Sequence, residues 1–198
     1  MVDITISGKF ILASASPRRI ELLTLMGLQF DIIPGDVDET FLQSETPREH
    51  VLRLSEEKAQ SVSILHPDAW VMGADTIVAI NGEVLGKPRT SDEAKEMLGK
   101  LSGQTHTVYT GFTLMKKSAD IVISEAVDSS VRFRRIPEDE MSWYVALEEP
   151  YDKAGGYAVQ GMGAFFIREI RGSYTNVMGL PLCEVVDVLK RVGALTFS

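Results

Sequence analysis

The spacing of apolar residues along this chain alternates between runs typical of strands and the three- and four-residue period typical of amphipathic helices. The apolar runs and the turn residues around them predict strands over residues 10–13, 29–34, 70–80, 83–85, 105–115, 121–133 and 164–170. The helical spacing predicts helices over residues 17–26, 47–65, 91–101, 137–147 and 182–192. Because strands and helices alternate, we expect an α/β fold.

Local signals predict where several elements begin. Ser16 before Pro17 is typical of a helix start, because proline suits the first helical position. The Thr-x-x-Glu segments at 46–49 and 90–93 predict capping boxes at two further helix starts. Asn81-Gly82 predicts a tight turn between two paired strands.

Composition is that of an ordinary globular protein, with 44% hydrophobic and 24% charged residues. We expect residues 1–198 to form a single α/β domain, and the length allows two closely joined lobes. Cys183 is the only cysteine, so no internal disulfide can form, which fits a reducing compartment. We expect Cys183 to be buried, because its neighbours are apolar.

The chain is acidic, since 20 Lys and Arg against 28 Asp and Glu give a formal net charge of −8. This charge disfavours binding to duplex phosphates, so we expect no nucleic-acid partner. A small phosphorylated ligand needs only a local basic pocket and remains compatible. The segment Met1–Phe10 lacks the features of a signal peptide, and no apolar run is long enough to span a membrane. We therefore expect a cytoplasmic protein with no membrane partner.

A candidate anion site lies where the first predicted strand meets the first predicted helix. Small residues from Ser14 to Ser16 would let a phosphate approach the helix N-terminus, whose free N–H groups favour an anion. Arg18 and Arg19 add permanently charged donors. The alternative is a surface helix start with solvated arginines. The loop is not a Walker A motif, because Gly-x-x-x-x-Gly-Lys is absent.

Carboxylates supply a second group of candidates. Asp75 lies inside an otherwise apolar strand, where an unpaired carboxylate is costly. It is either a strand-end side chain bonded to backbone or to Thr76, or a metal ligand or general base. The acidic run 36–39 is either solvated loop charge or, facing a phosphate pocket, a site for magnesium or manganese.

Isolated lysines form the third group, and each alone is compatible with surface charge. Lys58 differs from Lys87 and Lys153 because it lies near the apolar side of its predicted helix. The three histidines have no metal-ligand spacing, and no serine lies in a nucleophile elbow. A basic anion pocket with carboxylates and no covalent nucleophile suits metal-assisted attack of water on a phosphate ester.

Seven segments in order resemble the motifs of the Maf family of nucleotide pyrophosphatases, and the resemblance covers nearly the whole chain. They are Leu12-Ala13-Ser14-Ala15-Ser16-Pro17-Arg18-Arg19-Ile20-Glu21-Leu22-Leu23, Asp36-Val37-Asp38-Glu39-Thr40, Glu57-Lys58-Ala59, Gly73-Ala74-Asp75-Thr76-Ile77-Val78, Gly86-Lys87-Pro88, Leu101-Ser102-Gly103-Gln104-Thr105-His106 and the stretch from Gly172-Ser173-Tyr174 to Gly179-Leu180-Pro181-Leu182.

The resemblance implies a long twisted mixed sheet flanked by helices, with two lobes around a deep cleft, similar to inosine triphosphatases. It implies cleavage between the α and β phosphates of a nucleoside triphosphate with a divalent cation. Asp75 matches the family's catalytic aspartate. An aspartate is a weak base at neutral pH, so Asp75 could equally orient the water or hold the metal.

Further site residues follow from the same resemblance. Ser14 and Arg18 match positions that meet the triphosphate. Glu39 matches a position that can share the metal, while Lys58 and Lys87 can neutralise phosphate charge.

The segment 151–161 resembles the subgroup that acts on dTTP and UTP, and we expect modified pyrimidine nucleotides to be substrates as well. Arg18, Thr76 and Gln160 match the positions linked to substrate choice. A glutamine amide offers a donor and an acceptor, which matches the N3–H and carbonyl edge of thymine or uracil.

Two alternatives remain at this stage. A 7-methyl-GTP pyrophosphatase keeps the family and changes the subgroup, although Gln160 and its segment argue against it. A non-catalytic regulatory protein of septum formation, causing arrest of cell division, could replace the enzyme or coexist with it. Base rates for enzymes favour a homodimer, but no residue indicates one.

Overall fold

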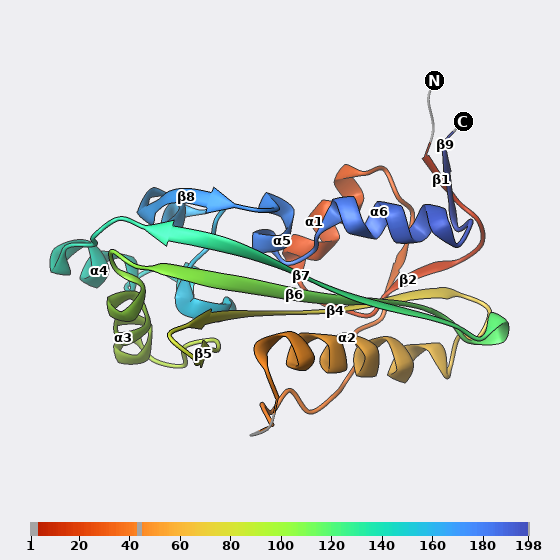
Figure 1. Cartoon of the computed structure of the whole chain (residues 1–198), viewed down its shortest axis with the longest axis horizontal. Helices are drawn as coiled ribbons and strands as arrows, with labels where there is room; N and C mark the ends of the chain where they lie inside the picture. The colour runs from red at the N-terminus through yellow and green to blue at the C-terminus, as the bar shows by residue number, and fades with distance from the viewer. Residues whose placement is uncertain (1–3, 43–44, 198) are drawn as a thin grey trace. The chain divides into compact units, whose positions relative to one another are not determined.

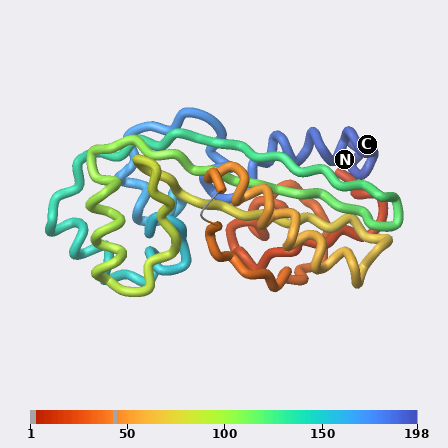
Figure 2. The backbone as a smooth tube through the Cα atoms, turned by 60° about the horizontal axis from the view of Figure 1, so that its bottom comes forward, coloured from red at the N-terminus to blue at the C-terminus, as the bar shows by residue number. Residues whose placement is uncertain are grey.

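The computed structural model describes residues 4–42 and 45–197, so the first three residues of the segment Met1–Phe10 lie outside the described part. The chain divides into two compact units (Figures 1 and 2). Unit 1 comprises residues 1–75, 110–127 and 179–198, and unit 2 comprises residues 76–109 and 128–178. That the two units form one domain around a cleft stays a prediction.

The principal sheet has the strand order β3-β2-β4-β6-β7-β8, and β5 pairs with β4. Its long strands are β4 (Trp70–Ile80), β6 (Thr105–Lys116) and β7 (Ile121–Phe133). The parallel pairs are β2 with β3 and β2 with β4, whereas β4 with β5 and β7 with β8 are antiparallel. The predicted α/β fold with a mixed sheet flanked by helices is therefore confirmed.

Unit 1 holds the short strands β2 (Phe10–Leu12) and β3 (Asp31–Ile32) and the helices α1 (Pro17–Leu25), α2 (Pro47–Ser63) and α6 (Leu182–Arg191). Helices α2 and α6 lie on opposite sides of the strands in both ribbon views (Figures 1 and 2). The apolar side of α2 packs on β2 and β4 in a fully buried cluster. Its buried members are Ile11, Ala13, Ala59, Val62, Ala69, Val71 and Met115.

Local signals at the helix starts of unit 1 behave largely as predicted. The Thr46 side chain accepts a hydrogen bond from the backbone N–H of Glu49, whose carboxylate accepts one from the N–H of Thr46, so the capping box is confirmed. Pro17 begins α1, although Ser16 makes no capping hydrogen bond.

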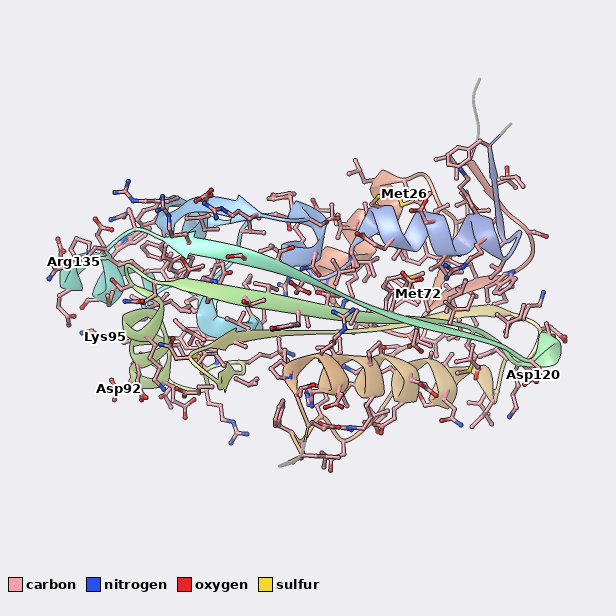
Figure 3. All side chains as sticks on the ribbon, viewed as in Figure 1. Met26, Met72, Asp92, Lys95, Asp120 and Arg135 are labelled. Carbon is pink, nitrogen blue, oxygen red and sulfur yellow. The ribbon has the colours of Figure 1, made fainter. Side chains whose placement is uncertain are left out.

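The β6–β7 turn ends at Asp120, which has a positive φ of 54° (Figure 3).

Unit 2 adds β5 (Glu83–Leu85), α3 (Ser91–Leu101), α4 (Glu138–Tyr144), β8 (Ile167–Arg171) and α5 (Tyr174–Met178). Its core gathers apolar side chains from these elements and includes Tyr144 and Phe166, both fully buried. Asn81 and Gly82 have φ values of 51° and 82°, as the predicted tight turn requires. The second capping box is only half formed, because Glu93 accepts from the N–H of Arg89 rather than from Thr90.

Two further sequence predictions were wrong. Cys183 is exposed, because the face of α6 that is buried carries Val185, Val188 and Leu189. Residues 162–166 form a 3-10 turn, and β8 begins only at Ile167.

Two short strands and one short α-helix were missed by the pattern analysis. The three-residue strands β1 (Ile4–Ile6) and β9 (Leu195–Phe197) pair with each other across the length of the chain, so no local signal reveals them. Helix α5 is one turn and a half long, which is too short for a helical period to stand out. Among the described residues, no helix is long and apolar enough to cross a membrane.

Candidate active site

Three charged side chains of unit 1 converge on one point. Lys58, on α2, donates a hydrogen bond of 2.8 Å from Nζ to Oδ1 of Asp75 on β4. The same Nζ lies 2.6 Å from Oε1 of Glu39 in the acidic loop. Lys58 and Asp75 are 6% and 7% exposed, so this is a largely desolvated ion pair, while the side chain of Glu39 is 55% exposed. The structure therefore brings together three predicted site residues from three segments.

Glycines on the sheet allow α2 to come this close. A Cβ on Gly73 would lie 2.1 Å from the backbone oxygen of Ser55 and 2.6 Å from the backbone nitrogen of Ala59. On β6, a Cβ on Gly111 would lie 2.2 Å from the backbone oxygen of Val51. Since real Cβ atoms are almost never within 3.0 Å of another atom, a side chain at either position would force α2 and the strand apart. The close helix–strand approach places Lys58 within hydrogen-bonding distance of Asp75.

A hydrogen-bonded clasp holds the loop that carries Glu39. Arg53 on α2 donates from Nη2 to the backbone oxygen of Thr40 at 3.0 Å and pairs with Glu45 and Glu57. His50 also contacts Glu45 at 3.0 Å. The hydrogen bond from Arg53, supported by that from His50 and opposed by desolvation, lowers the pKa of Glu45 to about 2. The clasp anchors the C-terminal side of Glu39 to α2 through Thr40, which in turn donates hydrogen bonds to Oδ1 of Asp38 on the other side of Glu39.

The adjacent arginines at the start of α1 occupy different environments. Arg19 is buried, and its acceptors include the backbone oxygen of Gly179 at 2.8 Å, Oγ of Ser14 at 2.9 Å and the backbone oxygen of Ala74 at 2.9 Å. Desolvation lowers the pKa of Arg19, while the negative charge of Asp75 acts in the opposite direction. Arg18 is half-buried on the first turn of the helix.

Arg19 is a functional candidate that the pattern analysis did not separate from Arg18. Its hydrogen bonds join the small-residue loop, the strand residue before Asp75 and the start of the C-terminal segment. Successive residues on a helix point about 100° apart, which implies that two adjacent arginines cannot both face the same surroundings. That geometry was the available signal, although it could not tell which of the two is buried.

The remaining predicted site residues belong to unit 2. Thr76 follows Asp75 on β4 and is half-buried, whereas Lys87 and Gln160 are exposed. The segments that carry the last two residues are joined, since the N–H of Gly155 donates to the backbone oxygen of Gly86 at 3.0 Å. That Thr76, Lys87 and Gln160 act on the same substrate as the residues of unit 1 stays a prediction.

The described residues contain no large preformed cluster of metal ligands. No group of three or more His, Cys, Asp or Glu side chains there could enclose a metal ion. Asp75 and Glu39 nevertheless lie within reach of one ammonium group, so two carboxylates can approach a single point. This donor set suits a hard cation that takes most of its ligands from water and from a phosphorylated substrate.

Comparisons with known proteins agree over nearly the whole chain. A dTTP/UTP pyrophosphatase of Syntrophus aciditrophicus is 63% identical over 193 residues, which cover 98% of this chain and 94% of that protein. A dTTP/UTP pyrophosphatase of Geotalea uraniireducens is 51% identical over 188 residues, with 95% of this chain and 97% of that protein covered.

A solved structure, the Ham1 protein of Staphylococcus aureus, is 14% identical and covers 64% of this chain and 72% of its own, with a TM-score of 0.47. That score is too low to carry an argument, and the likeness to inosine triphosphatases stays a prediction. The family model described as Maf-like protein matches residues 9–192. With this match and relatives of such identity over nearly its full length, the chain belongs to the Maf family.

Proposed function

We propose that this protein is a nucleoside triphosphate pyrophosphatase that hydrolyses dTTP and UTP to the monophosphate and pyrophosphate. Relatives that are 63% and 51% identical over nearly the whole chain are named dTTP/UTP pyrophosphatases. The observation that carries the proposal for this chain is the buried pair of Lys58 and Asp75, joined by Glu39, in the unit that also contains the anion-suited start of α1.

The start of α1 and the lysines bind the phosphates in this proposal. Ser14 accepts hydrogen bonds at Oγ from Arg19 and from the N–H of Ser16, which leaves its hydroxyl proton to donate to a phosphate oxygen. Arg18 lies on the helix turn whose dipole favours anions. Lys58 and Lys87 neutralise charge on the phosphates.

Asp75 and Glu39 would hold the divalent cation, magnesium or manganese. Both carboxylates bind Lys58 here, and two carboxylates with phosphate and water oxygens make a suitable ligand set for such an ion. When bound, the cation withdraws electron density from the phosphate oxygens and makes the phosphorus more electrophilic. Arg53 and Glu45 keep Glu39 in position through the loop clasp.

The reaction is attack of water on the α phosphorus. A new bond forms from the water oxygen to that phosphorus, and the bond from the phosphorus to the bridging oxygen breaks, so pyrophosphate leaves with the electron pair. Lys58 binds Oδ1 of Asp75, so Oδ2 is the oxygen that receives a proton of the attacking water when Asp75 acts as the base. When Asp75 instead holds the cation, that proton passes to solvent water. The Lys58 ammonium also offsets negative charge that develops in the transition state.

Recognition of the base falls to Thr76 and Gln160. The glutamine amide pairs its carbonyl with N3–H and its NH₂ with a ring carbonyl of thymine or uracil. Both bases present the same edge there, which explains why one enzyme would accept dTTP and UTP. Modified pyrimidine nucleotides that keep this edge are expected substrates as well.

The test is to incubate the protein with dTTP, UTP, CTP, GTP, ITP or 7-methyl-GTP, with magnesium or manganese, and to identify the products. We expect monophosphate and pyrophosphate from dTTP and UTP, and a fall in kcat of at least about 100-fold in Asp75→Asn. Orthophosphate with a nucleoside diphosphate would contradict the proposed site of attack. Preferential turnover of 7-methyl-GTP would contradict the proposed substrate.

Two further properties stay predictions of the sequence. Cytoplasmic localisation is compatible with the free Cys183, because a reducing compartment keeps thiols unpaired. A homodimer would be detected as twice the chain mass in sedimentation or light scattering.

A further inference from the structure

We propose that Glu149 is a positioning residue for substrate specificity: its carboxylate fixes the turn that follows Gln160 and so limits the orientations in which the glutamine amide can meet the base. This inference rests on the proposed function, because Gln160 is taken as the residue that recognises the base. Nothing in the sequence patterns singled out Glu149, which lies in an acidic stretch beside an exposed glutamate, Glu148.

The Glu149 carboxylate accepts hydrogen bonds from both sides. Its Oε1 accepts from the N–H of Gly163 at 2.9 Å and from the hydroxyl of Tyr144 at 2.7 Å. Its Oε2 accepts from the N–H of Met162 at 2.9 Å. Burial raises the pKa of Glu149, but these hydrogen bonds outweigh it, so the pKa lies below its usual value. An ionised carboxylate thus organises the turn that begins immediately after Gln160.

Two glycines let this turn close around the carboxylate. A Cβ on Gly161 would lie 2.1 Å from Oε2 of Glu149, and one on Gly163 would lie 2.7 Å from the hydroxyl oxygen of Tyr144. Gly161 is the next residue after Gln160, so its backbone is held directly against the carboxylate. Glu149 therefore constrains the Gln160 backbone from its C-terminal side.

The other side of Gln160 is anchored to the unit 2 core. Tyr157 is 5% exposed, and its hydroxyl lies 2.7 Å from Nε2 of His106, which is 2% exposed. The N–H of Gly155 donates to the backbone oxygen of Gly86. Two fixed points thus precede Gln160, and the Glu149 carboxylate supplies the fixed point that follows it.

Fixing the amide is necessary for specificity, because an amide that can rotate is ambiguous. Thymine and uracil present a donor at N3, whereas cytosine presents an acceptor there and a donor at its amino group. A glutamine that turns its amide over satisfies either pattern. Discrimination against cytosine therefore requires a backbone and side chain held in one orientation, since a site with fixed polar groups leaves them unpaired against the wrong base.

The experiment compares Glu149→Gln with the matched control Glu148→Gln. The glutamine at 149 loses the charge and replaces one acceptor oxygen by an NH₂ that opposes an N–H donor. We measure kcat/KM for dTTP and CTP, together with calorimetric binding of the non-hydrolysable α,β-methylene analogues of UTP and CTP. The melting temperature of each variant is measured alongside.

We expect the dTTP/CTP ratio of kcat/KM, and the ratio of analogue affinities, to fall about tenfold in Glu149→Gln and to stay unchanged in Glu148→Gln. In Gln160→Ala, the additional change Glu149→Gln should alter neither ratio further, because the amide is already gone. Equal losses of kcat/KM for both bases in Glu149→Gln, with the ratio kept, would overturn the proposal.

If Glu149→Gln does not fold, the same dTTP/CTP ratio is measured in Tyr144→Phe. This variant removes one hydrogen bond to the Glu149 carboxylate and keeps the aromatic ring in the core. A ratio that falls at least twofold supports the proposal, and an unchanged ratio overturns it. A wild-type protein that hydrolyses no triphosphate but prefers the UTP analogue refutes the proposed function alone. If the wild-type protein shows no preference between the analogues, the positioning role is refuted.

Discussion

Gly73→Ala tests whether the close approach of α2 to β4 creates the Lys58–Asp75 pair. The new Cβ would lie 2.1 Å from the backbone oxygen of Ser55, and real Cβ atoms are almost never closer than 3.0 Å, so helix and strand must separate by at least about 0.9 Å. The opposing atoms are backbone, so no side-chain rotation relieves the contact. The new Cβ would also lie 2.6 Å from the backbone nitrogen of Ala59, the residue after Lys58. The displacement therefore moves the Lys58 ammonium directly.

Two effects are expected, and they can be measured separately. Overpacking should lower the free energy of unfolding by about 2 kcal/mol and the melting temperature by about 4–8 °C. Displacing a catalytic group by nearly 1 Å should lower kcat for dTTP by about 10- to 100-fold. The melting temperature is followed by circular dichroism, and kcat is measured at 25 °C, where both proteins are folded.

Gly111→Ala is the matched control on the neighbouring strand. Its Cβ meets the backbone of Val51, seven residues before Lys58 and about 10 Å away along the helix, at an equally short 2.2 Å. We expect a similar loss of stability with less than a threefold fall in kcat. The reasoning is refuted if Gly73→Ala keeps kcat within twofold of wild type, or if both variants lose kcat equally.

Two further predictions concern the loop clasp and a buried histidine. Arg53→Met should remove the bonds to Thr40 and Glu45. In a magnesium titration, the concentration that gives half-maximal activity should rise about tenfold. An unchanged concentration would mean that the clasp does not position Glu39. Burial of His106 lowers its pKa to about 4, so between pH 6.5 and 4 the unfolded chain binds a proton that the folded protein does not. The free energy of unfolding should therefore decrease as the pH is lowered across that window, by up to about 3 kcal/mol. In urea unfolding curves, His106→Gln should make the free energy of unfolding less dependent on pH. An unaltered slope in the variant would assign the loss to other groups.

Much of the local structure follows from the sequence, because it depends on neighbours within a few residues. The apolar runs predicted β4, β5 and β7 with the observed bounds, and Thr46 and Glu49 predicted the start of α2. The family motifs named Asp75, Lys58 and Glu39, and the apolar side of its helix distinguished Lys58 from the other lysines. These signals are turn-forming residues, the period of apolar side chains and residue type, all of which are present in the linear sequence.

Tertiary structure decided which of these residues meet. Lys58 and Asp75 are separated by 17 positions, and their contact depends on glycines that permit two backbones to approach. The burial of Arg19 rather than Arg18 depends on carbonyl groups from distant segments. A sequence pattern assigns each side chain to a face of its own element, whereas ion pairs and the hydrogen-bonded clasp depend on how the elements pack. The chain by itself therefore determined the candidate residues and most of their strands and helices, and packing alone determined the hydrogen-bonded arrangement of the site.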